Sequence, residues 1–300
     1  MRTSIVIPTR NKAASLGATL AGLQRQSDTD FHVVVVDDGA ADDTLTVIAG
    51  AAGQGLNLRV VRLTGVGRAA ARNAGARAAD GDLLIFIDDD ILVPPHFVTA
   101  HIAAHLQGTD RPIGSAQPGA DLVVHGPLRE MPSAARLLDA APADPYSTAV
   151  GGDFGRTFVN SLERLVGDMA AGRVPAVAPW LACVGANVSM LAGTWQRLGG
   201  FDESYGQVWG CEDLELGYRL MIAGAAFHLA EQANGIHLSH PRPNRWEEHD
   251  LNLRRFITQH RDPAVIALPQ LLSGDGSAAG YLQAVCADRW LQSSNRGESS

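Results

Sequence analysis

An apolar run leads straight into three carboxylates. "LLIFI" (83–87) is followed directly by Asp88, Asp89 and Asp90. Crowded carboxylates are costly unless something positive balances them, and the chain contains a single lysine, Lys12. A divalent cation is therefore a good candidate, because Mg²⁺ and Mn²⁺ bind oxygen ligands, typically one or two carboxylates plus substrate phosphates. The alternative is a solvated acidic turn at the end of a strand.

A second acidic pair, Glu212 and Asp213, stands at the start of "CEDLELGYRL" (211–220). A carboxylate within hydrogen-bond reach can take a proton from a reacting hydroxyl group. The same two residues in the first turn of a helix would also stabilise the helix dipole without any catalytic role. Both interpretations stay open from the residues alone.

Histidines occur in two places. His237 and His240 lie in "GIHLSHP", a predicted strand, where a lone histidine is more often a hydrogen-bonded structural residue. His96, His101 and His105 follow the aspartates along one predicted helix. No carboxylate partner is evident for these three, so we expect an exposed helix face.

The elements that must position these groups alternate along the first hundred residues. Apolar strands are predicted at 4–8, 33–36, 58–63 and 83–87, with amphipathic or small-residue helices between them. This alternation predicts an α/β fold with a mostly parallel sheet and helices on both faces. Ligands of such sheets bind beyond the carboxyl ends of the strands. Asp37–Asp38 end the second strand there, and side-chain alternation predicts that Asp88 and Asp90 face one way and Asp89 the other.

Composition excludes several classes of function. The formal charge of −8 argues against nucleic acid as a partner. The start "MRTSIVIPTRN" does not resemble a secretory signal, and prolines and polar residues interrupt the longest apolar stretch (174–193), so no transmembrane segment is expected. The odd cysteine count suggests reduced thiols and a cytoplasmic location.

Other phosphate-binding proteins with similar sheets are excluded by missing motifs. Lys12 lacks the glycines of a P-loop, and no G-x-G-x-x-G follows the first strand. Phosphoaspartate receivers and haloacid-dehalogenase-type phosphatases need a lysine late in the sheet, and none occurs after Lys12.

The motifs resemble the family-2 glycosyltransferases, which have the Rossmann-like GT-A fold. The resemblance rests on "SIVIPTRNKAASLGATLAGLQRQ", "VVVVDDGAADDT" and "GRAAARNAGARAADGDLLIFIDDDI". In the second half, "ACVGANVSM" and "LGGFDESYGQVWGCEDLELGYRLMIAG" resemble the acceptor-side segment of galactosyltransferases and chondroitin-polymerase domains. Together these motifs cover residues 4–107 and 181–241.

The resemblance implies a set of residues that bind the nucleotide sugar. Its members would border the base, the ribose, the diphosphate or the sugar: Pro8, Thr9, Arg10, Asp38, Arg68, Asp88, Asp89 and Trp209. Asp38, or its neighbour Asp37, would hydrogen-bond to uracil. Trp209 would lie in a mobile loop that closes over the donor sugar. Arg72 and Asn73 fall nearby but are expected only to tie their helix to the sheet.

The resemblance also implies the metal and catalytic residues. Asp90 would bind Mn²⁺ or Mg²⁺, with a histidine from the late strand as a further ligand. Because an i, i+3 pair on an extended strand would not reach one ion, we expect His237 and not His240. Asp213 would be the general base, with Glu212 orienting the acceptor. Cys211 stands where the family commonly has glycine, so it would be strained if that backbone needs a positive φ.

The predicted function is a metal-dependent hexosyl- or N-acetylhexosaminyltransferase that moves a sugar to an acceptor hydroxyl with inversion, with a UDP-sugar as the expected donor. A retaining transferase and a non-catalytic nucleotide-sugar-binding protein stay open as alternatives. A nucleotidyltransferase is disfavoured, because its glycine-rich opening and catalytic lysine are missing. The acceptor, whether a saccharide, a lipid-linked molecule or a small molecule, is not identified.

Three segments are expected. Residues 1–107 would form the nucleotide-sugar-binding half, 108–250 the acceptor-binding and catalytic half of the same domain, and 251–300 a C-terminal helical extension with a polar tail. Residues 108–180 are predicted to be loops and short helices bordering the site. A peripheral membrane location is an alternative, because five late arginines could meet an anionic lipid-linked acceptor or form a solvated helix face: 242, 245, 254, 255 and 261.

Overall fold

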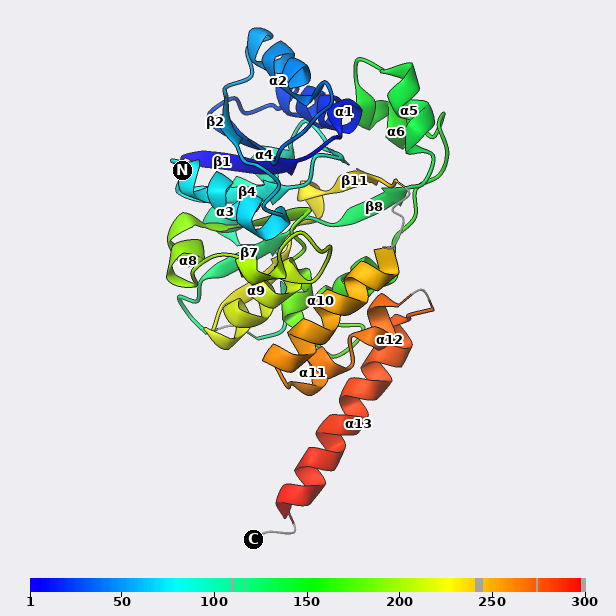
Figure 1. Cartoon of the computed structure of the whole chain (residues 1–300). Coiled ribbons are helices and arrows are strands. Elements are labelled where there is room, and N and C mark those ends of the chain that lie inside the picture. The colour runs from blue at the N-terminus through cyan, green and yellow to red at the C-terminus, as the bar shows by residue number, and fades with distance from the viewer. Residues whose placement is uncertain (109–110, 116, 241–244, 274, 298–300) are drawn as a thin grey trace.

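The N-terminal half has the predicted alternation of strands and helices (Figure 1). The computed structural model describes residues 1–108, 111–115, 117–240, 245–273 and 275–297. The strands of this half are β1 (Thr3–Thr9), β2 (Phe31–Asp37), β3 (Leu58–Arg62) and β4 (Leu83–Ile87), and the helices are α1 (Ala13–Gln24), α2 (Thr44–Gly53) and α3 (Arg68–Ala78). All four strands run parallel, in the order β3-β2-β1-β4.

Side chains alternate between two faces of this sheet, and helices cover both, as predicted. Ile5 and Ile7 of β1 pack in a cluster with Leu16 of α1, whereas Val6 packs with Ala69 of α3 in another cluster. Figure 1 shows α1 and α2 on one side of β1 and α3 on the other.

The second half of the chain completes the same sheet. Its eight-stranded order is β3-β2-β1-β4-β9-β7-β10-β6. The added strands are β6 (Pro112–Ile113), β7 (Leu122–His125), β9 (Asn187–Leu191) and β10 (Ala226–Leu229). Strand β9 lies antiparallel between β4 and β7, so a segment about a hundred residues downstream pairs directly with the strand that ends in the three aspartates.

Strand β9 also changes the interpretation of the histidine helix. Helix α4 (Phe97–Gln107) does not present an exposed histidine face. His101 is fully buried, with its ring nitrogens 2.9 Å from Ser189 Oγ and 3.0 Å from Asn187 Oδ1, and His105 Nε2 lies 3.0 Å from the same hydroxyl. The expectation was wrong because polar residues on β9, remote in sequence, supply the partners.

Residues 108–180 are more regular than predicted. Besides β6 and β7 they contain β8 (Leu128–Met131), α5 (Ala134–Ala140), α6 (Pro145–Gly151), α7 (Ser161–Ala170) and a 3-10 turn (Pro179–Ala182). Strand β8 belongs to a second, three-stranded sheet of order β5-β11-β8, with β5 (Ile91–Leu92) and β11 (Gly235–Leu238). This small sheet brings the end of the three-aspartate turn beside the late strand that carries His237.

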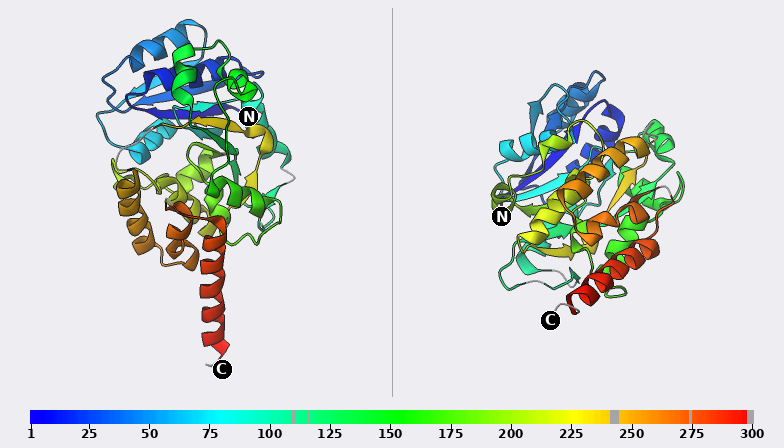
Figure 2. Two further views of the ribbon diagram at one scale, coloured as in Figure 1. Left: turned by 90° about the vertical axis from the view of Figure 1, so that its right-hand side faces the viewer. Right: turned by 60° about the horizontal axis from the view of Figure 1, so that its bottom comes forward.

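The last part of the chain is mostly helical. It comprises α8 (Ala192–Arg197), a 3-10 turn (Glu203–Tyr205), α9 (Glu212–Ile222), a 3-10 turn (Glu231–Ala233), α10 (Arg245–Gln259), α11 (Pro263–Ile266), α12 (Pro269–Leu272) and α13 (Ala278–Gly297). Helix α10 spans the segment boundary expected at residue 250. The expected C-terminal helical extension includes α13, which projects from the body of the molecule (Figures 1 and 2). Within the described residues, no helix combines the length and the hydropathy needed to cross a bilayer.

Candidate active site

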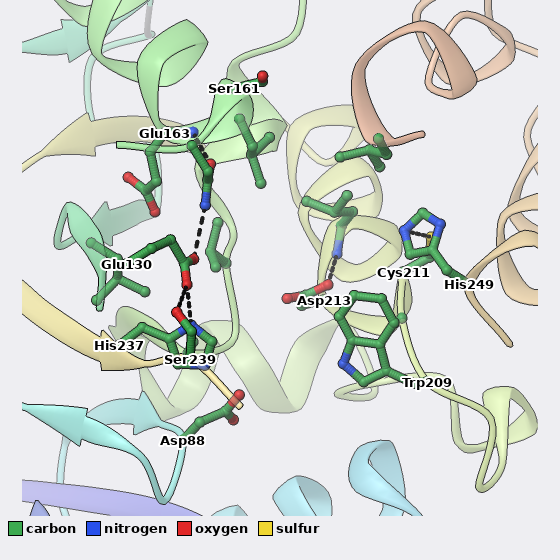
Figure 3. A pocket seen from close by; sticks show the side chains of 18 of the residues that line it. Asp88, Glu130, Ser161, Glu163, Trp209, Cys211, Asp213, His237, Ser239 and His249 are labelled. Carbon is green, nitrogen blue, oxygen red and sulfur yellow. Dashed lines mark hydrogen bonds and ion pairs between the residues drawn. The ribbon is translucent and has the colours of Figure 1, made fainter. Parts of the chain in front are cut away.

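Two adjoining cavities lie at the carboxyl ends of β1, β2 and β4. A cavity of about 320 Å³ is lined by all eight residues expected to bind the donor, from Pro8 to Trp209. A cavity of about 450 Å³, part of which is shown in Figure 3, is lined by Asp90, His237, Glu212 and Asp213. The predicted residue sets therefore come together in space as two neighbouring groups.

The three aspartates do not alternate as a strand would. Strand β4 ends at Ile87, and the chain turns through the aspartates. Asp88 accepts a hydrogen bond from Arg72 at 2.7 Å, whereas Asp89 and Asp90 both lie near Lys12 Nζ, at 3.3 and 2.6 Å. The predicted opposite orientation of Asp89 and Asp90 was wrong, because a turn does not obey the two-residue period of a strand.

Lys12 also lies at this site, although the sequence analysis did not predict it as a site residue. Burial alone would lower its pKa, but the carboxylates of Asp89 and Asp90 outweigh burial and raise it. Burial raises the pKa of Asp89 to about 6 despite Lys12. The singular occurrence of lysine was visible in the sequence, but its aspartate partners were not.

A three-residue cluster with metal-ligand character lies at the end of the turn. Asp90, His237 and His240 each offer one ligand atom, and these atoms lie within 4.8 Å of one another. Asp90 Oδ1 is buried and has no hydrogen-bond partner among the described residues, which fits an oxygen meant for a cation. The expectation that His240 would not reach was wrong, since β11 ends at Leu238 and His240 lies beyond the extended strand.

Glu130 of β8 lies next to His237 and Ser239 (Figure 3). His237 Nδ1 lies 2.8 Å from Glu130 Oε2, and Ser239 and Asn160 donate to the same carboxylate at 2.6 and 3.1 Å. Burial would raise the pKa of Glu130, but these partners lower it to about 2. Burial would lower the pKa of His237, but Asp90 and Glu130 raise it to about 10. The motifs gave no sign of Glu130.

Arg72 links the two cavities. Its side chain is fully buried and donates to Glu212 Oε1 and to Asp88 Oδ1, each at 2.7 Å. A Cβ on Gly185 would stand 2.7 Å from Arg72 Cζ, so the glycine makes room for the guanidinium. Asn73 ties its helix to the backbone of Phe201, which lies in the loop after α8, and not to the sheet as expected. Arg72 does more than that, because it joins β4 to α9.

Asp213 and Glu212 open α9 but have different surroundings. Glu212 is buried against Arg72, whereas the half-buried Asp213 carboxylate faces the larger cavity near Trp209 (Figure 3). Asp213 accepts the amides of Gly185 and Leu214, each at 2.8 Å. Burial and Glu212 nevertheless raise the pKa of Asp213 to about 6.

The backbone before this pair is strained in the way the sequence suggested. Cys211 has φ +69°, in the left-handed region, and Gly210 has φ +105°. Cys211 Sγ lies 3.7 Å from His249 Nε2 of α10, and the Trp209 ring lies 5.3 Å from that of His249. Helix α10 therefore packs against the loop that carries Trp209.

Asp38 organises the edge of the smaller cavity. Its carboxylate accepts the backbone amides of Gly65, Val66 and Gly67 at 2.9, 2.7 and 2.9 Å. Asp37 accepts from Ala40 and lies near Arg62. The role expected for either residue toward uracil stays a prediction.

Two of the five late arginines, Arg254 and Arg255, make contacts within the protein. Arg254 pairs with Asp250, and Arg255 donates to the Ser204 carbonyl. Arg242 and the side chain of Arg245 lie outside the described residues.

Comparison with known proteins finds two family profiles along the chain. Residues 4–141 match the profile of "Glycosyl transferase family 2", and residues 175–241 match that of the "N-terminal domain of galactosyltransferase". Residues 4–141 are therefore similar to glycosyl transferase family 2. A validoxylamine A glucosyltransferase of Streptomyces hygroscopicus subsp. jinggangensis is 35% identical over 269 residues, which is 86% of this chain and 60% of that protein. The chain thus spans less than two thirds of the length of this relative.

Solved structures confirm the GT-A fold. A mannosyltransferase from Pyrobaculum calidifontis, in complex with GDP-Man and Mn²⁺, aligns with a TM-score of 0.57 over 99% of this chain and 76% of that chain, at 17% identity. Residues 1–349 of TarS from S. aureus, in complex with UDP-GlcNAc, align with a TM-score of 0.58 over 95% and 70%, also at 17% identity.

Proposed function

We propose that this chain transfers a sugar from a nucleotide sugar, with UDP as the favoured nucleotide, to an acceptor hydroxyl, and that the reaction depends on Mn²⁺ or Mg²⁺. The observation that carries the proposal is the juxtaposition of the two cavities. Lys12, Arg68, Asp88 and Trp209 line both of them, so a ligand in one cavity would meet a ligand in the other.

The donor would lie in the smaller cavity with its diphosphate toward Asp90. Asp90, His237 and His240 would hold the cation, which supplies positive charge for the departing nucleoside diphosphate. Asp88, kept ionised by Arg72, is placed to accept a hydrogen bond from a donor hydroxyl. Glu130 would hold His237 with its Nε2 directed at Asp90.

The acceptor would enter the larger cavity and meet Asp213. The pKa of about 6 leaves this carboxylate ionised at neutral pH but basic enough to take the acceptor proton. Glu212 is unsuited to that role, because its carboxylate is already paired with two arginines, Arg72 at 2.7 Å and Arg68 at 3.9 Å. A carboxylate in the acceptor cavity that can take the proton of the acceptor hydroxyl supports direct displacement with inversion over retention.

Similarity to named proteins supports both the reaction and the choice of donors. The relative described above is named as a glucosyltransferase, and the two solved structures hold GDP-Man and UDP-GlcNAc. The donor panel should therefore include both bases and several sugars.

The test is calorimetric titration with UDP-, GDP- and dTDP-sugars, in Mn²⁺ and in EDTA. We expect one nucleotide sugar to bind only with Mn²⁺, and Asp90→Asn to lose this binding. Asp82→Asn is the matched control, because Asp82 is an exposed aspartate at the other end of β4, paired with Arg2. A folded wild-type protein that binds no nucleotide sugar would contradict the proposed function.

A further inference from the structure

We propose that Lys12 is the counter-cation of the metal site. Its ammonium pairs with the Asp90 carboxylate and must move away when a divalent cation binds. The inference rests on the proposed function only in taking Asp90 as a metal ligand. It assigns Lys12 a role opposite to that of a ligand, since the ammonium competes with the ion.

The contacts place the ammonium on the carboxylate that would hold the ion, at the oxygen next to Asp90 Oδ1. Lys12 Nζ lies 2.6 Å from Asp90 Oδ2, and His240 Nδ1 lies 3.4 Å from the same oxygen. An ion held between Asp90 and His240 would therefore be a close neighbour of the ammonium. The ammonium and the divalent cation are both positive, and such close like charges repel strongly, most of all in a buried site.

The charges around the turn explain why such a group is needed. Arg72 neutralises Asp88, but it does not pair with the next two aspartates. In the described part of the chain, Lys12 is the one permanently charged side chain that forms an ion pair with Asp89 or Asp90. Both carboxylates are buried, at 5% and 1% exposure. Without Lys12, Asp89 would lose its one ion pair in the described part of the chain, and Asp90 would keep only His237 and His240 beside it whenever no metal is bound.

The lysine side chain is also able to leave. It is 21% exposed, it lines both cavities, and it sits on a flexible four-carbon stem. Its second contact, 3.3 Å to Asp89 Oδ1, gives the ammonium a partner to keep when it gives up Asp90.

Lys12 would therefore weaken the binding of a metal ion that arrives alone. An anionic diphosphate brought in with the ion adds negative charge and offsets the repulsion. The metal and the nucleotide would then bind cooperatively, with Lys12 as a source of the coupling.

The experiment is a Mn²⁺ titration without nucleotide, in which electron paramagnetic resonance measures the concentration of free Mn²⁺. We expect Lys12→Met to bind Mn²⁺ about tenfold or more tightly than wild type, and Lys12→Arg to keep affinity near wild type. Arg62→Met is the matched control: Arg62 pairs with Asp37, the aspartate at the end of β2, and should leave Mn²⁺ affinity unchanged. Circular dichroism shows whether each variant is folded.

A second measurement uses the wild-type sequence. Because Lys12 is the only lysine, reductive methylation with ¹³C-formaldehyde labels one side-chain amine besides the N-terminus. Diamagnetic Mg²⁺ should shift the Lys12 methyl resonance as the ammonium leaves Asp90, and EDTA should reverse the shift.

The outcomes separate this inference from the proposed function. Equal or weaker Mn²⁺ binding by Lys12→Met, or a Lys12 resonance that bound Mg²⁺ does not move, would overturn the inference while metal-dependent donor binding could still stand. Absence of Mn²⁺ binding in both proteins would overturn it as well. Nucleotide-sugar titration of the same samples then shows whether the donor site itself fails.

Discussion

Asp213 and Glu212 are neighbours in sequence with opposite surroundings. Glu212 is enclosed by arginine, and Asp213 faces open cavity with a raised pKa. We expect Asp213→Asn to lower the rate of sugar transfer by about 10²–10⁴-fold, because general base catalysis contributes that much. Donor affinity, measured by calorimetry on the same preparation, should stay close to wild type. A variant that transfers sugar at the wild-type rate would rule Asp213 out as the base.

The pH dependence follows from the same carboxylate. Asp213 must be ionised to accept a proton, and burial with Glu212 raises its pKa to about 6. The turnover rate should therefore fall as the pH drops through about 6 and level off above it. Since Asp89 also has a pKa of about 6, the profile should be measured as kcat at saturating donor, which removes the effect of Asp89 on donor binding. A flat profile between pH 5 and pH 8 would contradict this assignment.

Single residues also show where sequence reasoning reaches its limit. The eight residues expected to bind the donor and the acidic pair all line the two cavities, because motifs fix their type and order. Lys12, Glu130 and the bridging role of Arg72 were not, because each acts through a partner from a different element. No spacing rule along the chain predicts those contacts.

At the scale of elements, the loop that carries Trp209 lies on the start of α3. A Cβ on Gly67 would stand 2.0 Å from the Gly206 carbonyl oxygen. Gly67→Ala should therefore push this loop away and weaken donor binding, as measured by titration. Gly55→Ala is a close control, because Gly55 has the same φ of +95° but no atom within 4 Å of the added carbon. Equal effects of the two substitutions would show that strain, and not the loop contact, matters.

Strand β9 depends on buried polar contacts with α4. His101→Ala would remove the histidine partner of the buried Asn187 Oδ1 and one of the two histidine partners of Ser189, at a cost of about 1–3 kcal/mol in the free energy of unfolding. Urea denaturation measures this loss, with exposed His96→Ala as the control. Burial lowers the pKa of His101 from 6.5 to about 3. Its contribution to stability is therefore complete above pH 6.5 and is lost as the pH falls toward 3. Equal stabilities of the two variants at neutral pH would contradict this role.

Elements were predicted well where the hydrophobic period was regular. The strands and helices of the first hundred residues and α9 agree with their sequence patterns. The strands within residues 108–180 could not be predicted from the hydrophobic pattern, because β6, β7 and β8 are only two to four residues long. Strands this short carry too few residues to show a period, and their partners lie far along the chain.

At the scale of the whole molecule, the two halves form one sheet and share a buried ion network. Arg72 joins Asp88 of the first half to Glu212 of the second. Arg72→Met should cost about 3–5 kcal/mol in the free energy of unfolding, because it leaves two carboxylates without their buried partner. Denaturation should show one transition for the sheet in both proteins. Exposed Arg77→Met, on the same helix, provides the comparison. A loss no larger than that of Arg77→Met would argue against this network as a structural link.

The central claim is that the end of the three-aspartate turn, with the late strand beside it, holds a cation against a nucleoside diphosphate. A crystal grown with UDP and Mn²⁺ and measured at the manganese absorption edge tests it most directly. We expect an anomalous peak within coordination distance of Asp90 and of His237 or His240, next to the diphosphate. UDP bound in the smaller cavity without a peak at Asp90, or a peak elsewhere in the molecule, would contradict it.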